Sequence, residues 1–168
     1  MNTGTVTSTL TTLMSELVEG TPPTGGYMLN KGDEGLLRAL DRLSAEEASQ
    51  IINGGSSIAA HVDHVTYYIS LMNRWSDGEK PWRTADWSAS WRKATVTEES
   101  WAELRRSLAN EMRKWMTVLR EPRDVEAVEL TGMVASIAHL AYHMGAMRQM
   151  DRKVGGPLAK NEQDAFAS

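Results

Sequence analysis

Residues 136–150 read SIAHLAYHMGAMRQM, a stretch in which His139 and His143 stand four positions apart among apolar residues. Side chains at positions i and i+4 lie one above the other on a helix face, so two imidazoles with this spacing can reach one ion. The apolar residues around them recur with helical periodicity, at Leu130, Met133, Val134, Ile137, Leu140, Ala141, Met144 and Met147. We therefore predict a helix over about residues 124–153, ended by the glycine pair at 155–156.

Three further long helices are predicted to precede this one. The first ends near Gly20, and the second begins after Ser56 or Ser57. The third begins at Thr97 and ends before Pro122. Each helix has an apolar stripe whose residues are spaced mostly by three and four. In the first helix the stripe is Leu10, Leu13, Met14, Leu17 and Val18. In the second it is Ile58, Val62, Val65, Ile69 and Met72, and in the third it is Trp101, Leu104, Leu108, Met112, Trp115 and Leu119.

The segment between the first two of these helices combines a loop with short helices. Residues 21–32, TPPTGGYMLNKG, concentrate Pro and Gly and predict a loop that lies over the bundle. Its expected anchors are Tyr27, Met28 and Leu29. We expect one short helix capped by Asp33 and another that begins at Ser44, with Glu47 three residues later in the capping-box position.

A second connecting segment, from Ser76 to Val96, is rich in turn-forming residues. It holds three of the six tryptophans, Trp82, Trp87 and Trp91. Because tryptophan side chains normally need burial, this segment is predicted to be an ordered crossover between the second and third helices.

Together these patterns predict an all-α fold, a four-helix bundle with a Trp-rich crossover. We expect a single domain over residues 1–168, with a core over about residues 8–154 and a polar tail over 155–168. No stretch shows the alternation of polar and apolar residues that is typical of a strand.

Composition narrows the classes of function. A net charge of −4 and a pI near 5.6 disfavour nucleic acid as a partner. The absence of cysteine excludes thiolate metal sites, so any metal needs nitrogen or oxygen ligands. No apolar stretch is long enough to cross a membrane, and the N-terminal residues lack the features of a signal peptide, so a cytoplasmic location with no membrane partner is expected.

The four histidines form two pairs, His61 with His64 and His139 with His143. A third ligand, His64 or His61, would complete a three-histidine metal site that keeps a coordination position open. The simpler alternative is a set of hydrogen-bonded core histidines, although each imidazole buried without a partner costs about 1–3 kcal/mol. The chain has neither the HExxH of zinc proteases, nor the ExxH of di-iron bundles, nor the CxxCH of attached haem.

At these histidines the chain resembles the DinB-like (DinB/YfiT) family of four-helix-bundle metalloproteins. The resemblance is carried by residues 30–49, NKGDEGLLRALDRLSAEEAS, by residues 56–69, SSIAAHVDHVTYYI, and by residues 136–150. It implies one divalent ion, most often zinc or nickel, with iron or manganese as alternatives. The ligands that it implies are His64, His139 and His143, with His61 as an outer partner or an alternative ligand.

Relatives in that family transfer small thiols such as bacillithiol or mycothiol to electrophiles, or carry out a mycothiol-dependent isomerisation. A metal ion on three neutral imidazoles keeps its full charge and can activate a bound thiol or water. Together with the resemblance, this predicts a metal-dependent enzyme acting on a small molecule, a thiol S-transferase or hydrolase. The alternative is a non-catalytic metal- or ligand-binding bundle that acts through protein contacts, for example as a homodimer.

Candidates for a direct role in catalysis are few. Tyr68 and Tyr142 lie at helical spacing from the histidines and would orient a substrate, and Arg148 would bind an anionic group. Each has a simpler structural role, which is packing for the tyrosines and a salt bridge for the arginine. Asp63 and Glu129 do not have the spacing of a general base, which favours a thiol over a water nucleophile.

Overall fold

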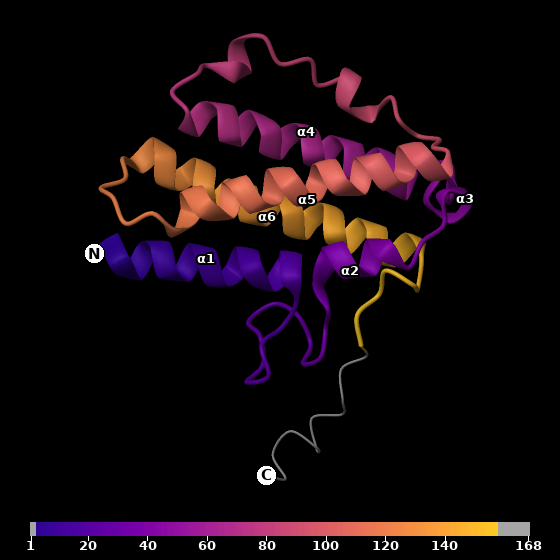
Figure 1. The fold of residues 1–168 in the computed structure, drawn as a ribbon, viewed down its shortest axis with the longest axis horizontal. Coiled ribbons are helices and arrows are strands. Elements are labelled where there is room, and N and C mark those ends of the chain that lie inside the picture. Colours follow the sequence, from indigo (N-terminus) through magenta and orange to yellow (C-terminus); the bar gives the residue numbers. More distant parts are fainter. Residues whose placement is uncertain (1–2, 158–168) are drawn as a thin grey trace.

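The computed structural model describes residues 3–157, and every regular element in that range is helical (Figure 1). The four long helices are α1 (Thr3–Glu19), α4 (Ile58–Ser76), α5 (Glu98–Arg120) and α6 (Ala127–Met150). The short elements are α2 (Gly35–Asp41), α3 (Ala45–Ala48) and the 3-10 turns η1 (Pro81–Arg83) and η2 (Ala89–Trp91). The predicted all-α fold is confirmed. Within the described range, no helix combines the length and apolar character needed to cross a bilayer.

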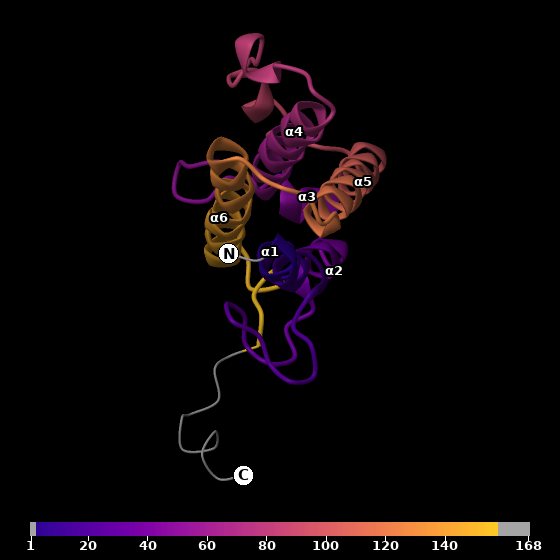
Figure 2. The same ribbon diagram turned by 90° about the vertical axis from the view of Figure 1, so that its left-hand side faces the viewer.

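The four long helices surround one core. α4 contacts α5 and α6, and α1 contacts the same two helices from the opposite side. Figure 2 looks nearly along their axes and shows α2 beside α1. Fully buried apolar side chains from all four helices belong to a single cluster that includes Met14, Ile69, Leu108 and Leu140. The two histidine-bearing helices, α4 and α6, are therefore neighbours in the bundle.

Polar caps start the helices where the sequence predicts them. The Ser57 hydroxyl accepts a backbone N–H of the first turn of α4. Thr97 and Ser100 form a capping box at the start of α5. The predicted capping box of Ser44 and Glu47 is present at α3. These caps satisfy N–H groups that have no partner within their own helix.

α6 is shorter than predicted at both ends. Its first helical residue is Ala127, because the cap residue Glu126 has an extended backbone (φ −72°, ψ 159°). Its last is Met150, since Asp151 is also extended and its carboxylate accepts the backbone N–H of Lys153 at 2.7 Å. Such local side-chain bonds compete with continuation of a helix.

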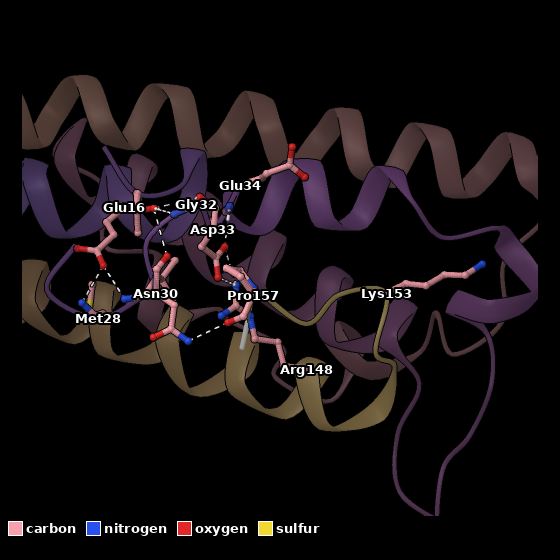
Figure 3. A network of polar contacts seen from close by, with 12 residues as sticks. Glu16, Met28, Asn30, Gly32, Asp33, Glu34, Arg148, Lys153 and Pro157 are labelled. Atoms are coloured by element: carbon pink, nitrogen blue, oxygen red, sulfur yellow. Dashed lines mark hydrogen bonds and ion pairs between the residues drawn. The ribbon is translucent and has the colours of Figure 1, made fainter. Parts of the chain in front are cut away.

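The loop of residues 20–34 is anchored through its backbone rather than through the side chains named from the sequence. The buried carboxylate of Glu16 accepts the N–H groups of Tyr27, Met28 and Leu29 at 2.8, 2.7 and 2.6 Å (Figure 3). Burial raises the pKa of Glu16, but these three N–H donors outweigh it and lower the pKa below its usual value. The side chains of Tyr27 and Met28 are exposed, so only Leu29 packs on the core as predicted.

Asp33, which the sequence predicts as a cap, makes two sets of contacts. Its Oδ1 accepts the N–H of Gly35 at 2.9 Å, although the residue in the cap position of α2 is Glu34. Both carboxylate oxygens also accept from the Arg148 guanidinium, at 2.9 and 2.8 Å, which ties the end of α6 to the loop (Figure 3). A Cβ at Gly156 would lie 1.9 Å from the same carboxylate, so the absence of a side chain at this glycine lets the backbone run close to Asp33.

The crossover between α4 and α5 lies along α4 (Figure 1). The Tyr67 hydroxyl accepts the N–H of Asp86 at 2.9 Å, and Asp63 pairs with Lys93 at 3.3 Å. The crossover is ordered as predicted, but its tryptophans are not buried in the core. Their exposed fractions are 39%, 44% and 38% for Trp82, Trp87 and Trp91. Trp82 packs on Tyr68 and Trp75 of α4, and Trp87 and Trp91 lie against His64, instead of entering the bundle.

Candidate metal centre

The four histidines face one another across the α4–α6 contact. His61 and His64 come from α4, and His139 and His143 come from α6. His64 and His143 are buried, while His61 and His139 are partly buried. Helical periodicity places each pair on one face, and packing of the two helices brings the faces together.

Three of the imidazoles converge through their Nε2 atoms. The Nε2 of His139 lies 3.2 Å from that of His64 and 3.1 Å from that of His143. One ring nitrogen from each of the three histidines lies within 4.8 Å of the other two. Bonds of about 2.0–2.1 Å from tetrahedral zinc to nitrogen place ligand nitrogens roughly 3.3–3.4 Å apart. The two Nε2–Nε2 separations that involve His139 are close to this value, as expected for ligands of one ion.

The donor set also fits a cation better than it fits hydrogen bonds alone. A neutral imidazole carries a single N–H, yet the Nε2 of His139 faces two other ring nitrogens. One hydrogen cannot point along both contacts. A cation among the three Nε2 atoms would satisfy all of their lone pairs at once.

His61 contacts the outer side of this group. Its Nδ1 lies 2.9 Å from the Nδ1 of His143, which is the ring nitrogen that points away from the Nε2 cluster. Of the two roles left open by the sequence, this geometry matches an outer partner rather than a ligand. Outer hydrogen-bond partners of this kind orient metal-binding imidazoles.

Aromatic side chains cover the histidines. The Trp91 ring stacks on His64 with centroids 4.3 Å apart, and the Trp87 ring lies 6.5 Å from the same imidazole. The Tyr68 ring lies 4.2 Å from that of His139. The crossover thus forms one wall of the site.

The comparison with protein families agrees with this arrangement. The family model of the DinB superfamily matches residues 28–147, a span that includes all four histidines. The chain belongs to the DinB superfamily. Comparison with curated proteins and with solved structures found no match.

The electrostatics of this DinB-superfamily site keep its imidazoles neutral. Burial, followed by the neighbouring imidazoles, lowers the pKa of His139 to about 4 and that of His143 to about 3. Burial also lowers the pKa values of His61 and His64. Neutral imidazole is the form that binds metal, so the four side chains are ready to act as ligands or outer partners at neutral pH.

The structure separates the three candidates for a direct role in catalysis. Tyr68 is partly buried and lies against His139. Tyr142 touches the edge of the His143 ring, with centroids 5.1 Å apart, but 72% of it is exposed. Arg148 is paired with Asp33, which is the salt-bridge alternative named from the sequence.

The acidic side chains of α4 and α6 form ion pairs with basic residues. Asp63 pairs with Lys93, and Glu129 pairs with Arg123. Among the residues that the structure describes, the metal-compatible group that includes His64 contains no carboxylate.

One contact of His64 is not predicted by the sequence. The Ser90 hydroxyl, in η2, lies 2.8 Å from the Nδ1 of His64. Ser90 stands in a segment without helical periodicity, so no spacing relates it to a histidine. The only signal was the cluster of tryptophans around it, which marked the crossover as ordered.

Proposed function

We propose that the Nε2 atoms of His64, His139 and His143 bind one divalent metal ion and that the protein is a metal-dependent enzyme. The proposed reaction uses a thiol or water nucleophile, as in a thiol S-transferase or a hydrolase. The observation that carries this proposal is the convergence of the three Nε2 atoms at 3.1–3.2 Å around His139 in a member of the DinB superfamily.

The ion expected here is zinc or nickel, because imidazole nitrogen suits both metals, with iron or manganese as alternatives. Held by neutral ligands alone, such an ion keeps its full charge and lowers the pKa of a water or thiol bound to it.

Residues of the chain supply the surroundings of that chemistry. Trp91 stacks on one face of the His64 imidazole and shields that face, and the Trp87 ring lies 6.5 Å from the same imidazole. Burial raises the pKa of Tyr68, so its phenol stays protonated at neutral pH and donates a hydrogen bond rather than accepting a proton. Tyr68 is therefore the candidate for orienting a substrate.

The choice between a water and a thiol nucleophile depends on the acidic side chains of the two histidine-bearing helices. Water attack normally needs a nearby group that accepts a proton. Asp63 and Glu129 are both held in ion pairs with basic residues. A small thiol, which ionises more readily than water, is therefore the nucleophile that we favour.

Metal analysis of single alanine variants tests the site. We expect wild type to retain about one equivalent of zinc or nickel after dialysis, and the His64→Ala, His139→Ala and His143→Ala variants to lose it. His61→Ala is the matched control, from the same cluster, and should retain metal. Equal metal content in all four variants and wild type would contradict the proposed ligand set.

Turnover tests the activity separately. Metal-loaded wild type is incubated with a panel of low-molecular-weight thiols and electrophiles, and in parallel with ester and amide substrates. We expect metal-dependent consumption of thiol that His64→Ala does not show. Metal retention without turnover of any substrate would favour the non-catalytic alternative.

That alternative, a homodimer that acts through protein contacts, has one supporting observation. The sequence of α6 between Glu129 and Arg148 contains no Asp, Glu, Lys or Arg, and on this helix Val134 and Tyr142 are exposed. Light scattering of wild type and of a Tyr142→Glu variant tests it. A dimer through this face predicts that the variant is monomeric, whereas a monomeric wild type would exclude it.

A further inference from the structure

Ser90 connects the crossover to the proposed metal site. Only 3% of this residue is exposed. Its hydroxyl oxygen lies 2.8 Å from the Nδ1 of His64 and 2.8 Å from the carbonyl oxygen of Trp87. The Ser90 hydroxyl thus contacts the ring nitrogen of His64 that is not proposed to bind the ion.

The hydrogens of this contact can be assigned from its geometry. A serine hydroxyl has one hydrogen, and a carbonyl oxygen can only accept. The Ser90 hydrogen therefore points to the Trp87 carbonyl, and the Ser90 oxygen accepts the Nδ1–H of His64. Because a neutral imidazole has one N–H, the Nε2 of His64 is left with a lone pair that faces the Nε2 of His139.

The same 3-10 turn also fixes the plane of this imidazole. Trp91, one residue after Ser90, stacks on the His64 ring with planes 21° apart. The hydroxyl holds one edge of the ring and the indole holds one face. The turn is fastened to α4 on either side, by the Asp86 contact to Tyr67 and by the Lys93 pair with Asp63.

We propose that Ser90 is a positioning residue for the metal site: by accepting the Nδ1–H of His64, it fixes the tautomer and ring orientation that present Nε2 to the ion. This inference rests on the proposed metal-binding role of His64. It also makes metal binding and order in the crossover interdependent, because the ion favours the His64 ring orientation that the turn holds.

The tautomer can be tested without metal. Nitrogen NMR of the metal-free protein at neutral pH distinguishes a protonated Nδ1 from a protonated Nε2 in each histidine. We expect the His64 hydrogen on Nδ1 in wild type, and a mixture of both tautomers in Ser90→Ala. A hydrogen on Nε2 of His64 in wild type would overturn the inference.

Metal affinity gives the second test. Competition with a chromophoric chelator should show zinc binding about 10- to 100-fold weaker in Ser90→Ala than in wild type. Ser88→Ala is the matched control: its exposed hydroxyl donates to Asp86 within the same crossover and does not contact a histidine. We expect its affinity to stay within about twofold of wild type, and Ser90→Thr, which keeps the hydroxyl, to recover much of the loss.

The outcomes separate the two proposals. If wild type binds zinc and Ser90→Ala binds it as tightly as Ser88→Ala, the role of Ser90 is wrong and the metal site stands. If wild type binds no metal, the proposed function fails, and the NMR result still decides whether Ser90 sets the tautomer of His64.

Discussion

The indole of Trp91 lies against the imidazole of His64, with ring centroids 4.3 Å apart and planes 21° apart. The same indole makes an edge contact with His61 at 5.4 Å. A single side chain of the crossover thus touches both histidines of α4. Its environment should change whenever the charge or ligation of these imidazoles changes.

Nickel binding should quench tryptophan fluorescence mainly through Trp91. Paramagnetic Ni²⁺ quenches over short distances, and the Trp91 ring is in direct contact with a proposed ligand. We expect Trp91→Phe to lose most of the nickel-induced change in a fluorescence titration. Trp82→Phe is the control, because Trp82 is equally exposed in the same crossover but contacts Tyr68, Trp75 and Trp87. Equal losses in both variants would argue against a metal ion next to His64.

Acid should destabilise the metal-free protein before the carboxylates titrate. Burial and neighbouring imidazoles lower the pKa of His139 from 6.5 to about 4, and that of His143 to about 3. Below pH 6.5 the unfolded chain takes up protons that the folded chain does not, so the free energy of unfolding falls steadily as the pH drops towards 4. Urea unfolding with a chelator, at pH of about 7.5, 6 and 5, measures this.

His139→Ala provides the control for that pH dependence. Removing one imidazole with a depressed pKa removes its share of the proton uptake on unfolding, so the variant should lose less stability between the highest and lowest pH. The same pH dependence in wild type and variant would mean that these imidazoles are already able to take up protons in the folded state.

Arg148→Ala should lower the stability of the fold rather than affect substrate binding. The variant leaves the Asp33 carboxylate, which is 2% exposed, buried without its partner. We expect a loss of about 3 kcal/mol in the free energy of unfolding. Arg38→Ala breaks an exposed pair with Glu34 and should cost only about 0–1 kcal/mol. Chemical denaturation compares the two, and equal losses would contradict the role assigned to Arg148.

Two glycines of α6 should respond oppositely to alanine. A Cβ at Gly132 would lie 2.5 Å from the Trp75 ring, whereas a Cβ at Gly145 would meet no atom of the described residues within 4 Å. Gly145→Ala should raise the free energy of unfolding by about 0.5–1 kcal/mol, because alanine favours the helix. Gly132→Ala should lower it, since the indole must move. Thermal melts of both variants measure the direction of each change in stability. Destabilisation by Gly145→Ala would mean that another part of the protein covers this position.

Helical periodicity explains why so much of the fold and the site followed from the sequence. It places His139 and His143 on one face of α6 and gives the apolar stripes that pack the bundle. Periodicity does not fix how α4 is rotated against α6, so His61 and His64, only three residues apart, could not be told apart from the residues alone. The family resemblance chose His64, and in the structure the Nε2 of His64 lies 3.2 Å from that of His139.

The crossover was harder to predict because its contacts are not periodic. Tryptophans normally lie in a core, but here Trp87 and Trp91 lie on imidazoles at the rim of the bundle. The link from Ser90 to His64 joins residues 26 positions apart through a 3-10 turn. Only the folded chain reveals such a pair.

The position of the crossover on α4 has a consequence for how the site can change. α4 carries His64 and also holds the crossover through Tyr67 and Asp63, whereas His139 and His143 stand on a separate helix. Residues 77–85 lie outside these two fastenings, and Trp82 in this stretch packs on Tyr68, which contacts His139, so replacements there would change the surroundings of the site. The inner nitrogens would keep their spacing, and one scaffold could be adapted to many reactants.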